Sequence, residues 1–152
     1  MAAGALVAAS VDQLIALFNA RSMDLPDGFF TRRTQFVLNG VPFEEMLGRS
    51  AGDPLVLMLT RGAAGYRFAA KAVQHALPDA TLQRGELTET SEHGIQMVRA
   101  QCWLSGHLRG GNEPVDVLVD VELRLHGGSV ETAGAVLDPT QAARLGEARL
   151  RP

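Results

Sequence analysis

One segment near the C-terminus alternates strictly between apolar and polar side chains, and it limits the possible folds more than any other feature. Side chains along an extended strand point to opposite faces in turn, so a period of two predicts a strand with one dry face and one wet face. The segment over 114–126 is therefore expected to be a half-buried antiparallel strand. Its apolar side carries Val115, Val117, Val119, Val121, Leu123 and Leu125, and its polar side carries Asp116, Asp120, Glu122 and Arg124.

The segments on either side of this strand show the same period. Strands are expected near 81–90, 95–109 and 129–137, with turns at 92–94, 110–114 and 127–129, where glycines gather. A short helix is expected over 139–145, ending at Gly146. The C-terminal half is therefore predicted to be a strand meander closed by one helix.

The N-terminal half shows helical periodicity instead. Ser10 and Gln13 form a capping box ahead of an apolar stripe that runs to Phe18. Asn39-Gly40 is the strongest two-residue hairpin signal in the chain, after a short strand over 34–38 and before a short helix over 43–47.

Two further helices are expected before the meander. Asp53-Pro54 has the pattern of a cap followed by a first-turn proline, and this helix would stop at Gly62. The next helix carries Tyr66 and ends before Pro78. Helices followed by a meander indicate an α+β fold, in which the helices cover one face of a curved, mainly antiparallel sheet.

Composition limits the function classes. The chain has 152 residues, a net charge of −3 and one cysteine, which fits a single domain over 1–152 with a flexible or helical extension over 1–9. No basic cluster exceeds Arg32-Arg33 and no apolar run reaches membrane-spanning length, so neither nucleic acid nor a membrane is an expected partner. The lone Cys102 suits a reducing cytoplasm and is interpreted as an inert core thiol.

Four segments carry a resemblance to a known family. FNARSMDL (18–25) is similar to a helix-ending N-x-x-D turn, and GYRFAAKAVQHALPDATL (65–82) to a helix-to-strand passage ending in Pro-Asp. VRAQCWLSGHLRG (98–110) resembles a W-x-x-x-G-x-H-x-G strand, and the segment up to Asp138 resembles a closing strand. Over 11–146 the chain resembles the nuclear transport factor 2-like superfamily, particularly its SnoaL-like polyketide cyclase and limonene epoxide hydrolase-like branches.

The resemblance implies a cystatin-like, cone-shaped α+β barrel with an internal pocket for a small apolar molecule. It implies acid/base chemistry without a cofactor, in a cyclase, isomerase or epoxide hydrolase, and a homodimer formed through the outer face of the sheet. In the enzymes of this family an aspartate ending the last strand serves as acid or base, and Asp138 holds that place. Asp138 followed by Pro139 and Gln141 is equally the start of a helix, so a purely capping role stays open.

The strand over 95–109 supplies the other catalytic candidates. The epoxide hydrolases carry an R-x-D pair there, whereas this chain has Arg99 and Gln101, and an amide cannot accept a proton from water. Arg99 could pair with Asp138 or hold a substrate oxygen, if the odd-numbered side of the strand faces the pocket. The alternative is that this side is the outer face of the sheet, because the strand alone does not fix which face is buried.

His107 matches the histidine of the family strand and could polarise a carbonyl, although a strand end is also a usual place for a solvated histidine. The four histidines show no ligand spacing, so no metal site is expected. The predicted pocket wall consists of Tyr66, Trp103, Phe18 and Met97, with plain packing as the alternative for each.

Two hypotheses remain. The first is an acid/base enzyme in which Asp138 transfers protons, Arg99 and His107 stabilise charge, and Gln101 and Tyr66 orient the substrate. The second is a non-catalytic ligand-binding or dimeric interaction module with the same fold. The glutamine at position 101 and the capping role open to Asp138 favour the second hypothesis, whereas the family matches on the strand of Trp103 favour the first. The enzyme is the preferred hypothesis.

Overall fold

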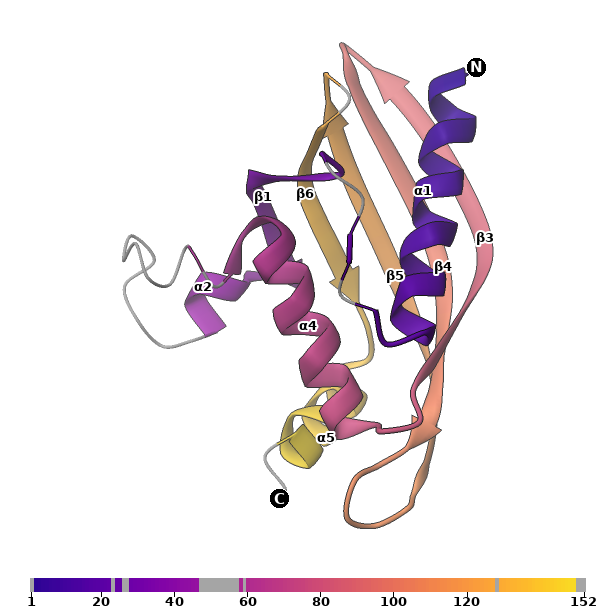
Figure 1. The fold of residues 1–152 in the computed structure, drawn as a ribbon, viewed down its shortest axis with the longest axis vertical. Helices are drawn as coiled ribbons and strands as arrows, with labels where there is room; N and C mark the ends of the chain where they lie inside the picture. Colours follow the sequence, from indigo (N-terminus) through magenta and orange to yellow (C-terminus); the bar gives the residue numbers. More distant parts are fainter. Residues whose placement is uncertain are drawn as a thin grey trace.

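The computed structural model describes residues 2–22, 24–25, 28–46, 58, 60–127 and 129–149. Among these residues, a long helix, a short β-hairpin, two further helices, four strands and a final helix follow one another (Figure 1). The elements are α1 (Ala2–Asn19), β1 (Phe30–Leu38), β2 (Val41–Pro42), α2 (Phe43–Met46), α4 (Gly62–Ala76), β3 (Thr81–Glu92), β4 (Ile95–His107), β5 (Pro114–His126), β6 (Ser129–Val136) and α5 (Pro139–Arg149).

All described strands belong to one six-stranded sheet with the order β2-β1-β6-β5-β4-β3. The strands β3 to β6 form the predicted antiparallel meander, and β1 joins it by pairing parallel with β6. The alternation in β5 sets the register, because a slip of one residue would turn its apolar row to the wet face. The predicted α+β class, with a curved and mainly antiparallel sheet, is confirmed.

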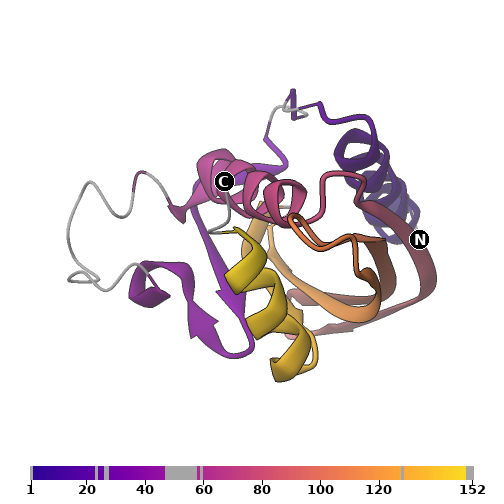
Figure 2. The same cartoon turned by 90° about the horizontal axis from the view of Figure 1, so that it is seen from below.

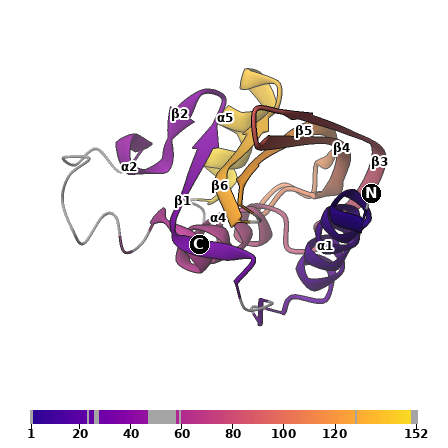
Figure 3. The same cartoon turned by 90° about the horizontal axis from the view of Figure 1, so that it is seen from above.

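The helices lie on the concave side of this sheet. Figure 3 shows the sheet bending around α1 and α4, with α1 beside β3 and α4 beside β1. Arg84 of β3 ties α1 to the sheet, because its Nε donates to Oδ1 of Asp12 at 2.5 Å. Seen from below, α5 lies alongside α4 at one end of the molecule (Figure 2).

The buried side chains form two clusters between sheet and helices. One cluster lies at the end that holds α5 and includes Phe18, Leu77 and Leu104. The other includes Phe36 and Val98, from β1 and β4. Tyr66 and Leu38 pack against both clusters and so mark the seam between them.

The hairpin and the long strands follow the sequence predictions closely. Asn39 and Gly40 both have positive φ, of 49° and 81°, as a tight two-residue turn between strands requires. The Asn39 side chain also accepts a hydrogen bond from the backbone N–H of Leu137, so the turn is tied to the end of β6. β3, β4, β5 and β6 begin where the sequence predicted them, and their ends differ from the prediction by two residues at most.

Two helix boundaries were wrong. Ser10 does not start the first helix, because α1 already begins at Ala2 and the alanine-rich run before Ser10 favours helix. The last helix does not end at Gly146 but continues to Arg149. Burial of Ala148, which is 0% exposed, favours this extra turn over the local preference of glycine for a helix end. The helix predicted from Asp53-Pro54 lies largely outside the described residues, and Gly62, where it was expected to stop, is the first residue of α4.

Candidate functional site

The concave face of the sheet is apolar along its two central strands. On β4 the even-numbered residues Val98, Ala100, Cys102 and Leu104 are buried, and on β5 the odd-numbered residues face the same way. Burial raises the pKa of the Cys102 thiol and keeps it protonated, as an inert core cysteine should be. The middle of β5 is less covered than its ends, because Val119 and Val121 are half-buried.

Tyr66 brings a polar atom to this apolar side. It lies on α4, its ring stacks on Phe30 at a centroid distance of 6.1 Å, and its residue is half-buried. The phenol oxygen itself is buried and has no hydrogen-bond partner. Burial raises the pKa of Tyr66, so the phenol stays neutral and can donate a hydrogen bond near neutral pH.

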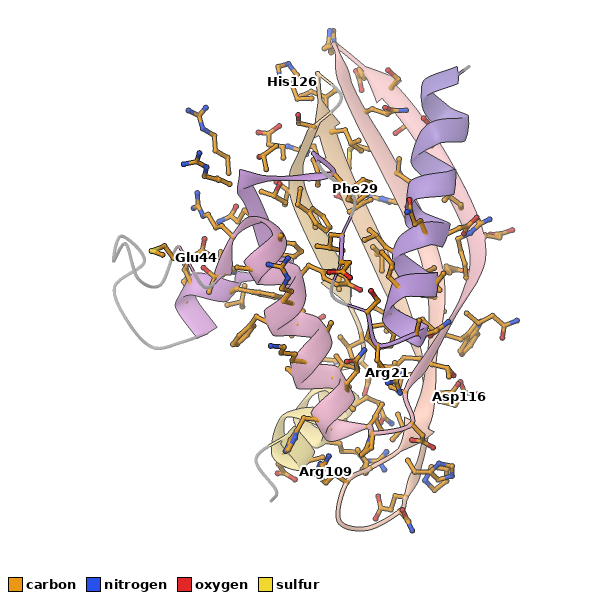
Figure 4. The ribbon with its side chains drawn as sticks, in the orientation of Figure 1. Arg21, Phe29, Glu44, Arg109, Asp116 and His126 are labelled. Atoms are coloured by element: carbon orange, nitrogen blue, oxygen red, sulfur yellow. The ribbon has the colours of Figure 1, made fainter. Side chains whose placement is uncertain are left out.

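A second buried polar atom of this kind belongs to Glu44 of α2. Glu44 is 2% exposed; its Oε1 accepts a hydrogen bond from Nε of Arg61 at 2.8 Å, and its Oε2 has no partner. Figure 4 shows Glu44 on the side of α4 away from α1. No sequence pattern singles out Glu44, since a glutamate in a short amphipathic helix ordinarily faces water.

Four predicted site residues lie on the opposite, convex face of the sheet. Arg99, with its side chain 70% exposed, donates from Nε to Glu122 of β5 at 2.8 Å. Gln101 is exposed opposite Asp120, and Trp103 is 44% exposed opposite Leu118. Met97 belongs to the same odd-numbered row. The odd-numbered side of β4 is therefore the outer face, which was the alternative left open by the sequence.

Met97 does line a surface depression, but this depression lies on the convex side of the sheet. This open depression of about 330 Å³ lies at the tip of the β3–β4 hairpin. Its other lining residues are strand-end and turn residues, of which Glu92 and His93 are more than four-fifths exposed. An open and hydrated hollow of this kind does not resemble a pocket for an apolar molecule.

Asp138 has the geometry of a helix cap. Its Oδ2 accepts a hydrogen bond from the backbone N–H of Gln141 at 3.1 Å, and its carbonyl oxygen accepts from the N–H of Ala142. The residue is exposed, just beyond the end of β6. These contacts match the capping alternative, and they leave the carboxylate outside the concave face.

His107 is part of a polar junction rather than of the concave face. One carboxylate, that of Asp79, accepts from the backbone N–H of His107 at 2.7 Å and lies 2.6 Å from its Nδ1. This contact lowers the pKa of Asp79, first through the hydrogen bond to the His107 ring. Gly106 permits the approach, because a Cβ there would lie 2.9 Å from Asp79 Oδ1.

The same junction gathers residues from three of the sequence motifs. Asn19 pairs with the backbone of Leu82 through both atoms of its amide, and Arg21 donates to the carbonyl oxygens of Pro78 and Ala80. Arg109 donates from its side chain to the carbonyl oxygen of His75. Arg21 and Arg109 lie at the same end of the molecule in Figure 4. These motifs therefore hold the ends of α1, α4 and β4 together.

Replacing Asp79 with asparagine should destabilise the protein by about 1 kcal/mol at pH 7, because it weakens two partly exposed hydrogen bonds. The pKa of Asp79 lies below its ordinary value of 3.8, so the stabilisation is complete above that value and is lost as the pH falls through the folded-state pKa. Urea unfolding at pH 7 and pH 3 should therefore show the difference from wild type shrinking in acid. Asp120→Asn is the control, and an equal loss in both variants would contradict the role of the junction.

The structure thus does not bring Arg99, Gln101, His107 and Asp138 together. Of the predicted wall residues, Phe18 is 5% exposed within a core cluster, and Tyr66 alone combines a concave position with a buried polar atom that has no partner. Within the described ranges no group of three or more His, Cys, Asp or Glu side chains could hold a metal ion. No helix there is long and apolar enough to cross a membrane.

Several solved structures resemble this fold. No protein-family model matches the sequence, and no curated protein matches it. Among solved structures, IdmH from Streptomyces antibioticus matches with a TM-score of 0.63 at 15% identity, over 91% of this chain and 97% of that chain. A SnoaL-like polyketide cyclase from Agrobacterium tumefaciens matches with a TM-score of 0.53 at 16% identity, over 87% and 91% of the two chains.

A third similar structure comes from a protein crystallised together with a small molecule. TerC, co-crystallised with polyporic acid, matches with a TM-score of 0.57 at 12% identity, over 91% of this chain and 95% of that chain. At these identities the likeness concerns the fold and not the activity. The chain has the nuclear transport factor 2-like fold in the form shared with SnoaL-like polyketide cyclases.

Proposed function

We propose that this protein is a cofactor-independent enzyme of the SnoaL-like cyclase type, acting on a small, mostly apolar carbonyl compound bound between the sheet and the helices α1 and α4. The observation that carries the proposal is the phenol of Tyr66, a buried hydrogen-bond donor without a partner on an apolar face. A ligand carbonyl would give this donor its partner. The half-buried Val119 and Val121 would form part of the apolar wall.

The charge pattern favours a neutral ligand. Along the central strands β4 and β5, the charged side chains stand on the convex face or at strand ends, and the concave rows are apolar. Transfer of an anionic group to such a surface without a counter-charge is strongly unfavourable. A folded polyketide-like or terpenoid-like chain with one carbonyl near Tyr66 fits this surface. The phenol would polarise the carbonyl and so favour loss of an α-proton to water, giving the enol from which ring closure or isomerisation proceeds.

A non-catalytic ligand-binding module is the second candidate. The observation in its favour is that Arg99, Gln101, His107 and Asp138 do not meet on the concave face. The two candidates differ in proton transfer. An enzyme of the proposed type should accelerate deuterium exchange next to the carbonyl of 2-tetralone in ²H₂O, whereas a binding module should leave the background rate unchanged.

Tyr66→Phe tests the contact itself. The substitution removes only the phenol oxygen, so affinity for a ketone probe should fall about tenfold, by about 1.4 kcal/mol, through loss of one hydrogen bond. The melting temperature should stay level or rise, because a buried polar atom without a partner is removed. The measurement is an NMR shift titration with 9-fluorenone.

Fluorene, which lacks the carbonyl oxygen, is the matched probe. Wild type should prefer 9-fluorenone to fluorene, and Tyr66→Phe should bind the two equally. Absence of binding of either probe to wild type would contradict the proposal. If Tyr66→Phe still prefers 9-fluorenone to fluorene, Tyr66 does not contact the ligand carbonyl.

We also propose that the protein forms a homodimer through the convex face. Trp103 and Leu118 lie opposite each other there, and the exposed Val136 follows on β6. Beside these apolar residues stands the Arg99–Glu122 pair, which offers both signs of charge to a second copy. A face with apolar residues bordered by both charges can be self-complementary about a two-fold axis.

A further inference from the structure

We infer that Glu44 is a positioning residue for Tyr66: by holding Arg61, it fixes the first turn of α4 against β1 and thereby the place of the phenol. The functional meaning of this coupling rests on the proposed ligand contact of Tyr66. The coupling itself is a property of the free protein. It can therefore be tested without any ligand.

Glu44 and Arg61 are joined by an ion pair between their side chains. Glu44 lies in the short helix α2 with its side chain 2% exposed, and Arg61 stands directly before α4 with its side chain 33% exposed. The 2.8 Å contact uses Nε of Arg61 and one carboxylate oxygen of Glu44. Because the carboxylate is enclosed, its position is set by the packing of α2, and the guanidinium follows it.

The backbone of Arg61 connects this ion pair to the start of α4. Arg61 is the N-cap residue of α4, in an extended conformation, and no side chain caps the helix there. Its carbonyl oxygen accepts the first bond of the helix itself, from the N–H of Gly65 at 3.3 Å, and its backbone forms an isolated bridge with Gln35 of β1. A helix start without a capping side chain depends on outside contacts such as this bridge for its position.

The start of α4 lies very close to β1. A Cβ on Gly62 would lie 2.7 Å from the carbonyl oxygen of Thr31, and a Cβ on Gly65 would lie 2.5 Å from the ring of Phe36. Tyr66 follows directly and stacks on Phe30 of the same strand. Two glycines let the helix approach, but they do not prevent it from sliding along β1. The backbone bridge of Arg61 to Gln35 and the Arg61–Glu44 bond together supply that restraint.

Because Oε2 of Glu44 has no partner, the Glu44–Arg61 pair is better suited to positioning α4 than to stabilising the fold. A buried ion pair that leaves Oε2 without a partner loses much of its electrostatic gain to desolvation. In some proteins, buried polar pairs fix the relative placement of the elements they join. Here the joined elements are α2 and the start of α4, which carries Tyr66.

Tyr66 can be observed directly, because it is the only tyrosine in the chain. Labelling tyrosine with ¹³C at Cζ gives one resonance, and its pH titration reports the environment of this phenol alone. The titration in wild type should lie above the ordinary value of about 10. In Glu44→Gln the midpoint should move down by at least about 0.5 pH unit, since a displaced phenol gains contact with water.

Glu45 provides the matched control, as an exposed glutamate on the same short helix. Glu45→Gln should leave the tyrosine titration unchanged. Arg61→Lys lacks the Nε–H donor and loses its positive charge in the pH range of the tyrosine titration, since an ordinary lysine titrates near pH 10. Loss of a nearby positive charge would by itself raise the tyrosine midpoint, so a downward shift in this variant reports displacement of the phenol. Arg61→Lys also serves if Glu44→Gln does not fold. Circular dichroism at each pH restricts the comparison to folded protein.

A tyrosine midpoint that stays at the wild-type value in both Glu44→Gln and Arg61→Lys, while the melting temperature falls, would overturn the inference and leave the pair a purely structural role. Equal shifts in Glu44→Gln and Glu45→Gln would overturn it as well. Failure of the ketone probes to bind wild type would remove the proposed function but would not move the tyrosine titration. The two failures are therefore distinguishable.

Discussion

Gly65→Ala is expected to destabilise the protein by about 3 kcal/mol, because an added methyl group overpacks a site that has no free space. The new Cβ would lie 2.5 Å from both the Phe36 ring and the backbone carbonyl oxygen of Thr60. The ring is 7% exposed and stacks on Phe43, so it cannot swing away freely. Unfolding in urea should show the loss, with a melting temperature lower by roughly 6–12 °C for a chain of this length.

The matched control is Gly146→Ala in α5. No atom lies within 4 Å of a Cβ built on Gly146, and the residue is exposed inside a helix. Alanine should stabilise this position by about 0.5–1 kcal/mol, since glycine weakens helix interiors. The same substitution thus has opposite effects at two helical glycines. A stable Gly65→Ala protein would show that α4 does not pack on β1 as described.

Leu118→Glu is expected to weaken homodimerisation at least 100-fold, which corresponds to about 3 kcal/mol. The substitution places a charge at the centre of the apolar part of the convex face, opposite Trp103. Trp103 is the only tryptophan and is 44% exposed in the single chain, so its fluorescence reports coverage of this face alone. Dilution of wild type should shift its emission to the red, and Leu118→Glu should show the red-shifted emission at all concentrations.

Ala143→Glu controls for the added charge, because Ala143 is exposed on α5, away from the convex face. This variant should dimerise as wild type does in sedimentation velocity. A wild-type protein that sediments as a monomer at all concentrations would refute the homodimer. If Leu118→Glu and wild type dimerise equally, a dimer must form through another surface.

Most of the fold was predictable because its signals are local. The alternation of β5 and the glycine-containing turns on both sides of it fixed the meander, and Asn39-Gly40 fixed the hairpin at the N-terminal side of the sheet. The errors occurred where burial overrides local preference. Gly146 has the local pattern of a helix end, yet the packing of Ala148 extends α5 past it.

The site was less predictable, since it depends on which face of β4 turns inward. The sequence left both faces open for Arg99 and Gln101, and the pairing of β4 with β5 places them outside with Glu122 and Asp120. His107 and Asp79, 28 residues apart, belong to separate motifs whose contact no spacing could reveal.

The sequence by itself determined the class of fold, because apolar side chains recur every two residues in a half-buried strand and every 3.6 residues in a helix. Both periods can be read from neighbouring positions in the chain. It also identified Asp138 as a possible cap, since capping involves only the next few residues. Only the tertiary structure decided which polar groups are buried. The enclosure of Glu44 and the phenol of Tyr66 arises from α2, α4 and β1 packing together, and no local pattern encodes a contact between elements distant in the chain.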